Sequence, residues 1–325
     1  MKSVLKNIVA AAALVLAAGT AHAGDYPEKA VTIVAPYGAG GASDMAARAL
    51  AETARDYLGD QPVVVVNKPG NGGMIGARFV SEIEPDGYTL LLARVGMALY
   101  PAVQESSPVG WDGYTFLGSL EATPMILAVA ENSPYKSAEE LIAAMKAEPG
   151  ALTYGASGAT AIDGFTVQAL LADNELDPLT AATLVPYKGG GALATALLGG
   201  HVDFLAIAAG SLMPHIESGK MRALMVYAPS RMDTLPDVPT AAELGFDKAG
   251  QITGWSALYG PKDLPEEVVT RWQETLNKVG EDETWLELAK RRGSISTAGK
   301  EDMPAYAKSQ YELFNGLARE FGYIQ

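Results

Sequence analysis

Apolar runs alternate with glycine-rich loops and amphipathic stretches along most of the chain. Val31–Pro36 is apolar and rich in β-branched residues, which is typical of a buried strand. After a loop of small residues, a helical pattern predicts one apolar face, made of Met45, Ala49, Leu50, Thr53 and Tyr57. Strand, glycine loop and helix in this order predict an α/β fold with a largely parallel sheet.

The same order continues over the next 40 residues. Val63–Val66 is a second apolar strand, and Asn67–Gly73 is a glycine-rich loop. We expect a helix near Ile75–Glu84 and a third strand over Tyr88–Ala93. These elements complete a first α/β unit.

A second unit of similar design begins at the apolar run Met125–Ala130. Ser137–Ala147 is a predicted helix with a capping box, because Glu140 follows Ser137 at a spacing of three. The other predicted elements are strands at Leu152–Tyr154, Leu184–Pro186, Val202–Ile207 and Met221–Tyr227 and helices at Asp163–Ala172 and Ala192–Leu198.

The order of elements predicts two lobes that share the ends of the chain. We assign residues 24–125 and 248–325 to the first lobe and residues 126–247 to the second. Pro124–Ala130 and Trp255–Tyr259 are the candidate short crossover strands between the lobes, since no low-complexity linker separates the halves. The amphipathic helices expected at Glu266–Val279 and Met303–Phe321 are expected to pack on the first lobe.

Residues 1–23 have the pattern of a secretory signal peptide. Lys2 and Lys6 precede the apolar run Ile8–Ala18, and Ala21-His22-Ala23 is a small-x-small cleavage site. An uncleaved membrane anchor is the alternative, but the run is short for a hydrocarbon core of about 30 Å. The sequence therefore predicts an exported protein of the periplasm.

Composition excludes several classes of function. The 24 Lys and Arg against 38 Asp and Glu give a charge of −14, and cleavage removes two lysines and no acid, which makes it −16. A nucleic acid or an anionic membrane is therefore not an expected partner. The chain has no cysteine and three histidines, so thiol chemistry, Cys-ligated metals and a His-rich metal site are excluded. We expect no cofactor and no metal.

Two strand-to-helix loops are the candidate ligand site. Glycine lets the backbone approach a ligand, and a helix start attracts anions through its free N–H groups. A plain turn is the alternative at each loop, but two similar loops in two lobes favour a shared ligand. The candidate residues are Tyr37, Gly38, Ala39, Gly40, Gly41 and Ser43 in the first loop and Ser157, Gly158, Ala159 and Thr160 in the second.

Single side chains near the strand ends add to this site. Arg94 ends the third strand and either pairs with a ligand carboxylate or forms a surface salt bridge. Asp163 and Asp44 lie in first helical turns, where an acid can serve the helix dipole; in the cleft, Asp163 would suit an amine or hydroxyl group. Tyr187 and Trp255 either wall the pocket or belong to the core.

Catalytic patterns are weak. Gly155-Ala156-Ser157-Gly158 lacks the full G-x-S-x-G turn, and neither His201 nor His215 lies in a context typical of a general base. No dinucleotide glycine pattern or phosphate-loop lysine occurs at the first loop. We therefore expect a binding protein and not an enzyme; an exported hydrolase is the alternative that predicts turnover.

Several motifs in order resemble one known family. They are Ile33-Val34-Ala35-Pro36-Tyr37-Gly38-Ala39-Gly40-Gly41, Asn71-Gly72-Gly73-Met74-Ile75-Gly76-Ala77, Pro85-Asp86-Gly87-Tyr88-Thr89-Leu90-Leu91, Val185-Pro186-Tyr187-Lys188-Gly189-Gly190 and Leu235-Pro236-Asp237-Val238-Pro239-Thr240. The chain resembles the TctC-like periplasmic solute-binding proteins of tripartite tricarboxylate transporters, also called Bug proteins (Bordetella uptake gene).

The resemblance implies a type II periplasmic binding protein, with two α/β lobes that close on a carboxylate. It implies that Tyr37–Ser43 and Ser157–Thr160 hold a di- or tricarboxylate or an aromatic acid, mainly through backbone groups and water. A monomer that delivers this ligand to a membrane permease is expected; a ligand-loaded sensor that contacts a membrane kinase is the alternative. Asp163 and Arg94 depart from the family pattern, in which histidine and a small polar residue are common.

Overall fold

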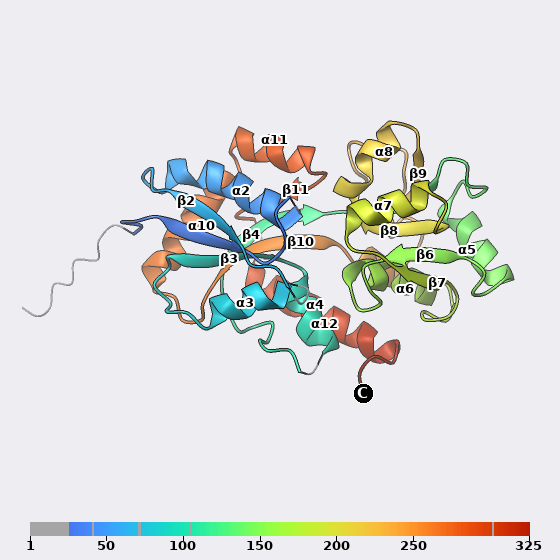
Figure 1. Cartoon of the computed structure of the whole chain (residues 1–325), viewed down its shortest axis with the longest axis horizontal. Helices are drawn as coiled ribbons and strands as arrows, with labels where there is room; N and C mark the ends of the chain where they lie inside the picture. The colour runs from blue at the N-terminus through green and yellow to red at the C-terminus, as the bar shows by residue number, and fades with distance from the viewer. Residues whose placement is uncertain (1–25, 41, 71–72, 105, 301) are drawn as a thin grey trace, which may run out of the picture.

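The computed structural model describes residues 26–40, 42–70, 73–104, 106–300 and 302–325. Two α/β lobes lie side by side, each with its own sheet (Figure 1). The predicted signal peptide, residues 1–23, lies outside the described residues.

The first lobe contains a six-stranded mixed sheet of order β11-β4-β10-β3-β1-β2. Strand β1 pairs in parallel with β2 and β3, whereas β10 pairs antiparallel with β3 and β4. Its strands are β1 (Val31–Ala35), β2 (Val63–Asn67), β3 (Thr89–Arg94), β4 (Thr115–Thr123), β10 (Gly254–Gly260) and β11 (Ile295–Ser296).

The second lobe contains a five-stranded sheet of order β7-β6-β8-β5-β9. Strand β6 is parallel to β7 and β8, and β5 is antiparallel to β8 and β9. Its strands are β5 (Met125–Ala130), β6 (Thr153–Ala156), β7 (Thr183–Pro186), β8 (Phe204–Ala208) and β9 (Met221–Tyr227).

Helices flank both sheets. In the first lobe they are α2 (Ala42–Ala54), the short 3₁₀ helix η1 (Arg55–Tyr57), α3 (Met74–Ser81), α4 (Gly96–Val103), α10 (Glu266–Val279) and α11 (Glu283–Arg291). In the second they are α5 (Ala138–Ala147), α6 (Ile162–Asp173), α7 (Gly190–Leu198), the 3₁₀ helix η3 (Ala209–Ser211), α8 (Met213–Glu217) and α9 (Asp247–Gly250). The predicted cap of α5 is confirmed, since Glu140 N donates to Ser137 Oγ at 3.3 Å.

The predicted apolar face of α2 is wrong at its two ends. Met45 is 44% exposed, whereas Asp44 beside it is 3% exposed. The helix turns Asp44 inward because this carboxylate accepts hydrogen bonds from the loop before α2 and from β2. Tyr57 falls outside α2, in η1, and is half-buried.

The chain crosses between the sheets in two places. The first crossing is at Pro124, between β4 and β5. The return lies in the segment between β9 and β10. The strand predicted at Trp255–Tyr259 is therefore confirmed as β10, but it belongs to the first sheet and the crossing comes before it.

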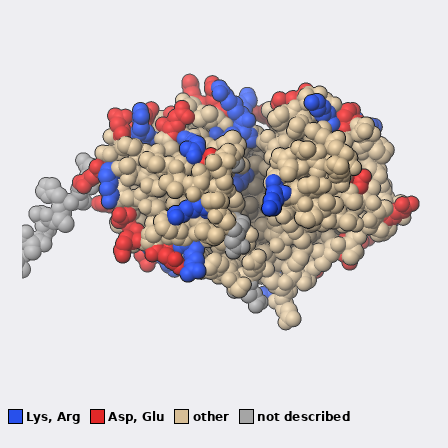
Figure 2. All heavy atoms as spheres, in the orientation of Figure 1, with Lys and Arg blue, Asp and Glu red and all other residues tan. Residues whose placement is uncertain are grey.

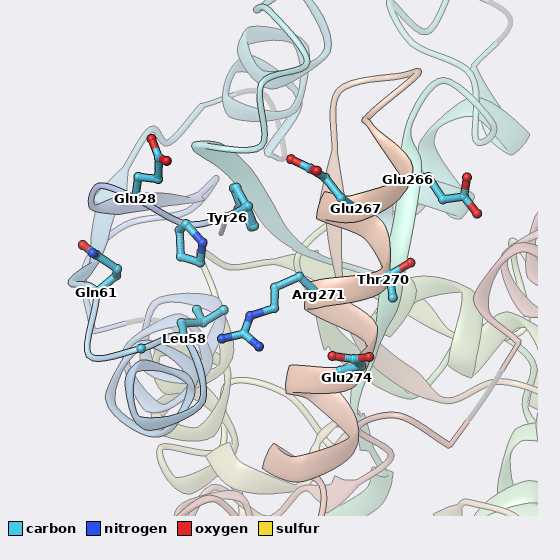
Figure 3. Close-up of a pocket in the computed structure, with 11 residues that line it drawn as sticks. Tyr26, Glu28, Leu58, Gln61, Glu266, Glu267, Thr270, Arg271 and Glu274 are labelled. Atoms are coloured by element: carbon cyan, nitrogen blue, oxygen red, sulfur yellow. The ribbon is translucent and has the colours of Figure 1, made fainter. Parts of the chain in front are cut away.

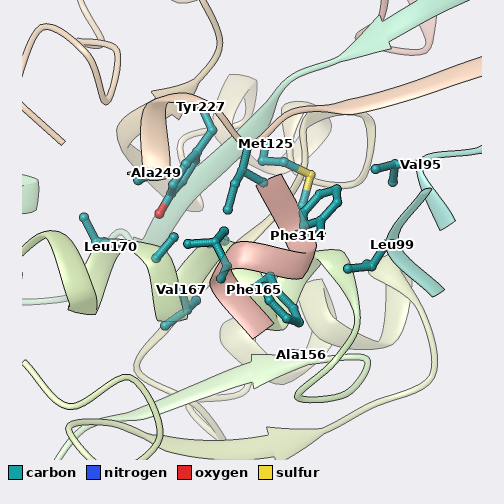
Figure 4. Packing of buried hydrophobic residues seen from close by; sticks show 14 of the residues in the cluster. Val95, Leu99, Met125, Ala156, Phe165, Val167, Leu170, Tyr227, Ala249 and Phe314 are labelled. Carbon is teal, nitrogen blue, oxygen red and sulfur yellow. The ribbon is translucent and has the colours of Figure 1, made fainter. Parts of the chain in front are cut away.

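The last helix, α12 (Met303–Glu320), contacts both lobes. Asn315 Nδ2 donates to Ala102 O at the end of α4, at 3.1 Å. On the other side, Phe314 packs edge-on against Phe165 of α6, with ring centroids 5.9 Å apart. One buried apolar cluster therefore combines residues of α4, α6 and α12 (Figure 4).

Candidate functional site

An internal carboxylate braces the first candidate loop. Asp44 Oδ2 accepts from Gly40 N at 2.9 Å and from Arg48 Nε at 3.1 Å, and Oδ1 accepts from Asn67 Nδ2 at 2.9 Å. Asn67 Nδ2 also donates to Tyr37 O at 3.0 Å. The hydrogen bond from Arg48, with those from Gly40 and Asn67, outweighs burial and lowers the pKa of Asp44 to about 2.

This bracing decides which groups of the first loop remain free for a ligand. The Gly40 N–H is already bound to Asp44, but in the described part of the chain no group accepts from the N–H of Gly38 or Ala39. Ser43 Oγ is buried and has no hydrogen-bond partner among the described residues. Gly40 has φ +77°, a conformation that favours glycine. The candidate Gly41 lies outside the described residues.

Tyr37 and Arg94 lie close to each other at the strand ends. A Cβ atom on Gly73 would lie 3.0 Å from Tyr37 Oη, and one on Gly96 would lie 3.3 Å from it, so the ring packs over two glycines. Burial raises the pKa of Tyr37, and the positive charge of Arg94 opposes this rise.

Arg94 ends β3 without a partner among the described residues. It is half-buried, and no described residue forms a hydrogen bond or an ion pair with it, so the predicted surface salt bridge is absent there. Ser256 of β10 lies opposite it in the sheet, and a Cβ on Gly254 would lie 3.5 Å from Arg94 Nη2. The guanidinium group therefore passes over Gly254, with its donors free.

A second internal carboxylate braces the second loop in the same way. Asp163 Oδ2 accepts from Ser157 N at 2.8 Å and Ser157 Oγ at 2.6 Å, and Oδ1 accepts from Gly164 N at 3.0 Å. Burial raises the pKa of Asp163, and these hydrogen bonds oppose the rise. No described group accepts from the N–H of Gly158, Ala159 or Thr160.

Tyr187 follows β7 and is half-buried. Its N–H donates to Ala156 O at 3.0 Å, which fixes the start of the segment after β7 to the end of β6. The side chain packs at the edge of the apolar cluster of the second lobe. Trp255 is buried and contacts Tyr306 of α12 edge-on at 5.5 Å, so it belongs to the core.

The candidate groups occupy the carboxyl ends of β1, β3, β6 and β7, which is where ligands bind in open α/β sheets. In Figure 1, α2 begins on the side of its sheet near the second lobe, and β6 points toward the first lobe. Figure 2 shows a hollow between the lobes with Lys or Arg atoms at its wall. That the predicted residues contact a ligand there stays a prediction.

The residues that hold the two loops in place were not predicted from the sequence. Arg48 and Asn67 act through Asp44. The sequence signal for Asn67 was its place directly after the predicted strand Val63–Val66. The buried ion pair of Glu121 in β4 with Arg292, at 2.9 Å, also went unpredicted. Arg48 lies one helical turn after Asp44, but Asn67 and Arg292 are distant in sequence from their partners, so no local pattern links them.

A large cavity of about 1130 Å³ lies elsewhere, on the outer side of the first lobe (Figure 3). Tyr26, Glu28, Leu58 and one side of α10, including Arg271 and Glu274, line it. Neither candidate loop contributes to its wall.

Metal and membrane features are not found in the part of the chain that the structure describes. No group of three or more His, Cys, Asp or Glu side chains there could hold a metal ion. None of the described helices combines the length and the apolar character needed to cross a membrane.

Comparison with known proteins gives a family match. The model of the TctC family, described as the tripartite tricarboxylate transporter family receptor, matches residues 46–303. The match includes the second candidate loop and begins just after the first. A UPF0065 protein from the TAR-I ttuE–ttuC′ intergenic region of Agrobacterium vitis is 32% identical over 88% of this chain and 82% of its own length.

Solved structures share the fold. The periplasmic binding protein BugD is 29% identical, with a TM-score of 0.78 over 92% of this chain and 99% of BugD. An R. palustris protein solved with adipate is 24% identical, with a TM-score of 0.79 over 91% of this chain and 98% of that protein. The two-lobed α/β fold predicted from the sequence is confirmed by these likenesses.

Proposed function

Since this chain belongs to the TctC family of tripartite tricarboxylate transporter receptors, we propose that it captures a small organic carboxylate between its lobes. The ligand is a di- or tricarboxylate or an aromatic acid. The R. palustris structure of this fold holds adipate, a dicarboxylate, which supports this class. The loaded protein delivers its ligand to the membrane permease of the transporter, in the periplasm and as a monomer.

The observation that carries the proposal is the set of free backbone donors in both lobes. Gly38 and Ala39 in the first lobe and Gly158, Ala159 and Thr160 in the second have N–H groups that no described residue binds. Hydrogen bonds to a charged acceptor contribute about 1.5–3 kcal/mol each. Micromolar affinity requires a net binding free energy of about −8 kcal/mol, and the contacts must in addition offset the entropy lost on association. The donors of one lobe alone do not supply this, so donors from both lobes are needed together.

Arg94 supplies a full positive charge to the proposed site. With its donors free, it would pair bidentately with a second carboxylate of the ligand. Hydrogen bonds from the protein already engage both oxygens of each aspartate, so neither aspartate needs an amine on the ligand as a partner. The net charge of −16 of the mature chain does not prevent capture, because at physiological salt charges are screened beyond about 8 Å.

Ligand binding to donors from both lobes favours the closed arrangement, since only there can the acid contact both sets. The permease then recognises the closed form. This mechanism needs no covalent step, so the acid leaves unchanged.

Calorimetric titration of the cleaved protein with adipate, malate, citrate, benzoate and butyrate tests the proposal. We expect micromolar binding of at least one acid, and NMR of the recovered acid shows it unchanged. The proposal fails if the folded protein gives neither heat nor a thermal shift with any of them. Turnover of the acid would instead support the hydrolase alternative.

A further inference from the structure

Gln168 links the second candidate loop to the end of the chain. This residue of α6 is 1% exposed. Its Nε2 donates to Ala159 O in the loop at 3.0 Å and to Tyr323 Oη at 2.9 Å. Its Oε1 is buried without a partner among the described residues. The amide is therefore oriented by its two donor contacts, although one acceptor is left unsatisfied.

The loop carbonyls face α6, and this fixes where the loop N–H groups point. A Cβ atom on Gly164 would lie 2.3 Å from Gly158 O and 2.8 Å from Ala159 O. In a trans peptide the C=O and the following N–H point in opposite directions. The N–H groups of Ala159 and Thr160 therefore point away from α6, and these are two of the donors for which no described residue is the acceptor.

The segment after α12 holds Gln168 from the other side. Phe165, one turn before Gln168, lies 5.8 Å from Phe321 and 5.7 Å from Tyr323 between ring centroids. Lys248 of α9 pairs with Glu320 at 3.0 Å. The end of the chain is thus fixed on the second lobe by several contacts.

Helix α12, which precedes this segment, is also anchored on the first lobe. Asn315 donates to Ala102 O, and Tyr311 stacks on Trp111 with ring centroids 6.0 Å apart. The orientation of the second loop is consequently linked, through Gln168 and Tyr323, to a helix that also rests on the opposite lobe.

We propose that Gln168 and Tyr323 are positioning residues that hold the Ala159 carbonyl against α6, so that the Ala159 and Thr160 N–H groups face the ligand. The proposal rests on the proposed function for the ligand and on the geometry above for the positioning. Without these contacts the Ala159–Thr160 peptide can rotate, and the two donors no longer point the same way.

Two variants test the proposal. Tyr323→Phe keeps the ring on Phe165 and removes one hydrogen bond; Gln168→Met keeps the length of the side chain and removes both. For an acid that the wild type binds, we expect Kd to rise about three- to tenfold for Tyr323→Phe and more for Gln168→Met. Tyr311→Phe, on α12 and away from the loop, is the control and leaves Kd unchanged.

A second measurement needs no ligand. The Ser157 and Ala161 amides are hydrogen-bonded, to Asp163 Oδ2 and Gly158 O, so their hydrogen exchange reports the order of the loop. We expect faster exchange at both amides in Tyr323→Phe and Gln168→Met and wild-type rates in Tyr311→Phe.

Kd and hydrogen exchange together test the positioning role separately from the carboxylate-binding function. Variants with wild-type exchange and wild-type Kd overturn the positioning role while the carboxylate function stands. Faster exchange in a protein that binds no acid supports the positioning role and rejects the function. Variants that unfold globally would lower protection throughout the second sheet, and that result would assign these residues to stability and overturn the proposal.

Discussion

Asp44 of the first lobe and Asp163 of the second have the same structural role. Each lies in the first turn of the helix after its loop, and each accepts a backbone N–H of that loop, from Gly40 at 2.9 Å and from Ser157 at 2.8 Å. Each carboxylate thus takes up part of the positive potential of a helix start. The ligand receives the donors that remain.

Replacing Asp44 by asparagine tests the first of these braces. The pKa of Asp44 is lowered in the folded state to about 2, so the carboxylate stabilises the fold above its usual pKa near 3.8 and loses this effect as the pH falls toward 2. We expect Asp44→Asn to reduce stability by about 1–2 kcal/mol at pH 7. The difference from wild type shrinks below pH 4.

Urea unfolding between pH 2 and 7 measures this difference. Asp56→Asn is the matched control, because Asp56 is exposed and, among the described residues, forms its one ion pair with Arg55 at 3.8 Å. Equal curves for the two variants would show that Asp44 does not brace the loop.

Comparing Gly40→Val with Gly219→Val distinguishes the effect of backbone strain on stability from the effect of loop geometry on ligand binding. Gly40 and Gly219 both have positive φ, +77° and +67°, with open space where a Cβ would lie. Valine at either position costs about 1–3 kcal/mol of strain. The midpoint temperature of thermal unfolding should therefore fall by a similar amount in both variants. Only Gly40→Val is expected to weaken acid binding, by tenfold or more, in calorimetry; wild-type affinity would remove this loop from the site.

Gly164→Ala tests the close approach of α6 to the second loop. The new methyl group would lie 2.3 Å from Gly158 O, a backbone atom that cannot move without displacing the loop. We expect a loss of acid affinity of at least tenfold together with a lower melting temperature.

Gly316→Ala of α12 is the control for this helix substitution. A Cβ at Gly316 meets nothing within 4 Å, so alanine there stabilises the helix by about 0.5–1 kcal/mol. If Gly164→Ala behaved like Gly316→Ala, the loop would not depend on this contact.

Arg94→Ala tests how the second acid group is recognised. Because Arg94 has no partner among the described residues, its removal leaves no protein charge unpaired. We expect adipate to lose far more affinity than butyrate, by about tenfold or more for one charge-assisted pair. Arg78→Ala, which breaks an exposed pair with Glu82 at 2.7 Å, changes neither; equal losses for both acids with Arg94→Ala would contradict the assignment.

Periodicity predicted most of the fold because its signals are local. Glu266–Val279 is confirmed residue for residue as α10, and the family resemblance carried by the loop motifs is confirmed by the match over residues 46–303. Strand β4 went unpredicted because Gly118 and Glu121 interrupt its apolar pattern. Glu121 is buried there only because Arg292, 171 residues away, neutralises it.

The candidate site was predictable only in part, for the same physical reason. Loops with small residues at strand ends are visible in a sequence, but the direction of each N–H depends on partners elsewhere. Asp163 was a candidate ligand contact, and the structure engages both of its oxygens with Ser157 and Gly164; direct contact with a ligand stays a prediction. Gln168 and Tyr323 are 155 residues apart, which no local pattern connects.

A helix seated on both lobes restricts how the molecule can open. Rotation about the two crossing segments alone would separate α12 from either Ala102 or Phe165, so opening has to break or shift the contacts of this helix with one lobe. The final residues at Gln325 follow directly on that helix. An affinity tag fused after Gln325 would hinder this shift of α12. The ligand affinities measured with tags at opposite ends of the mature chain should therefore differ.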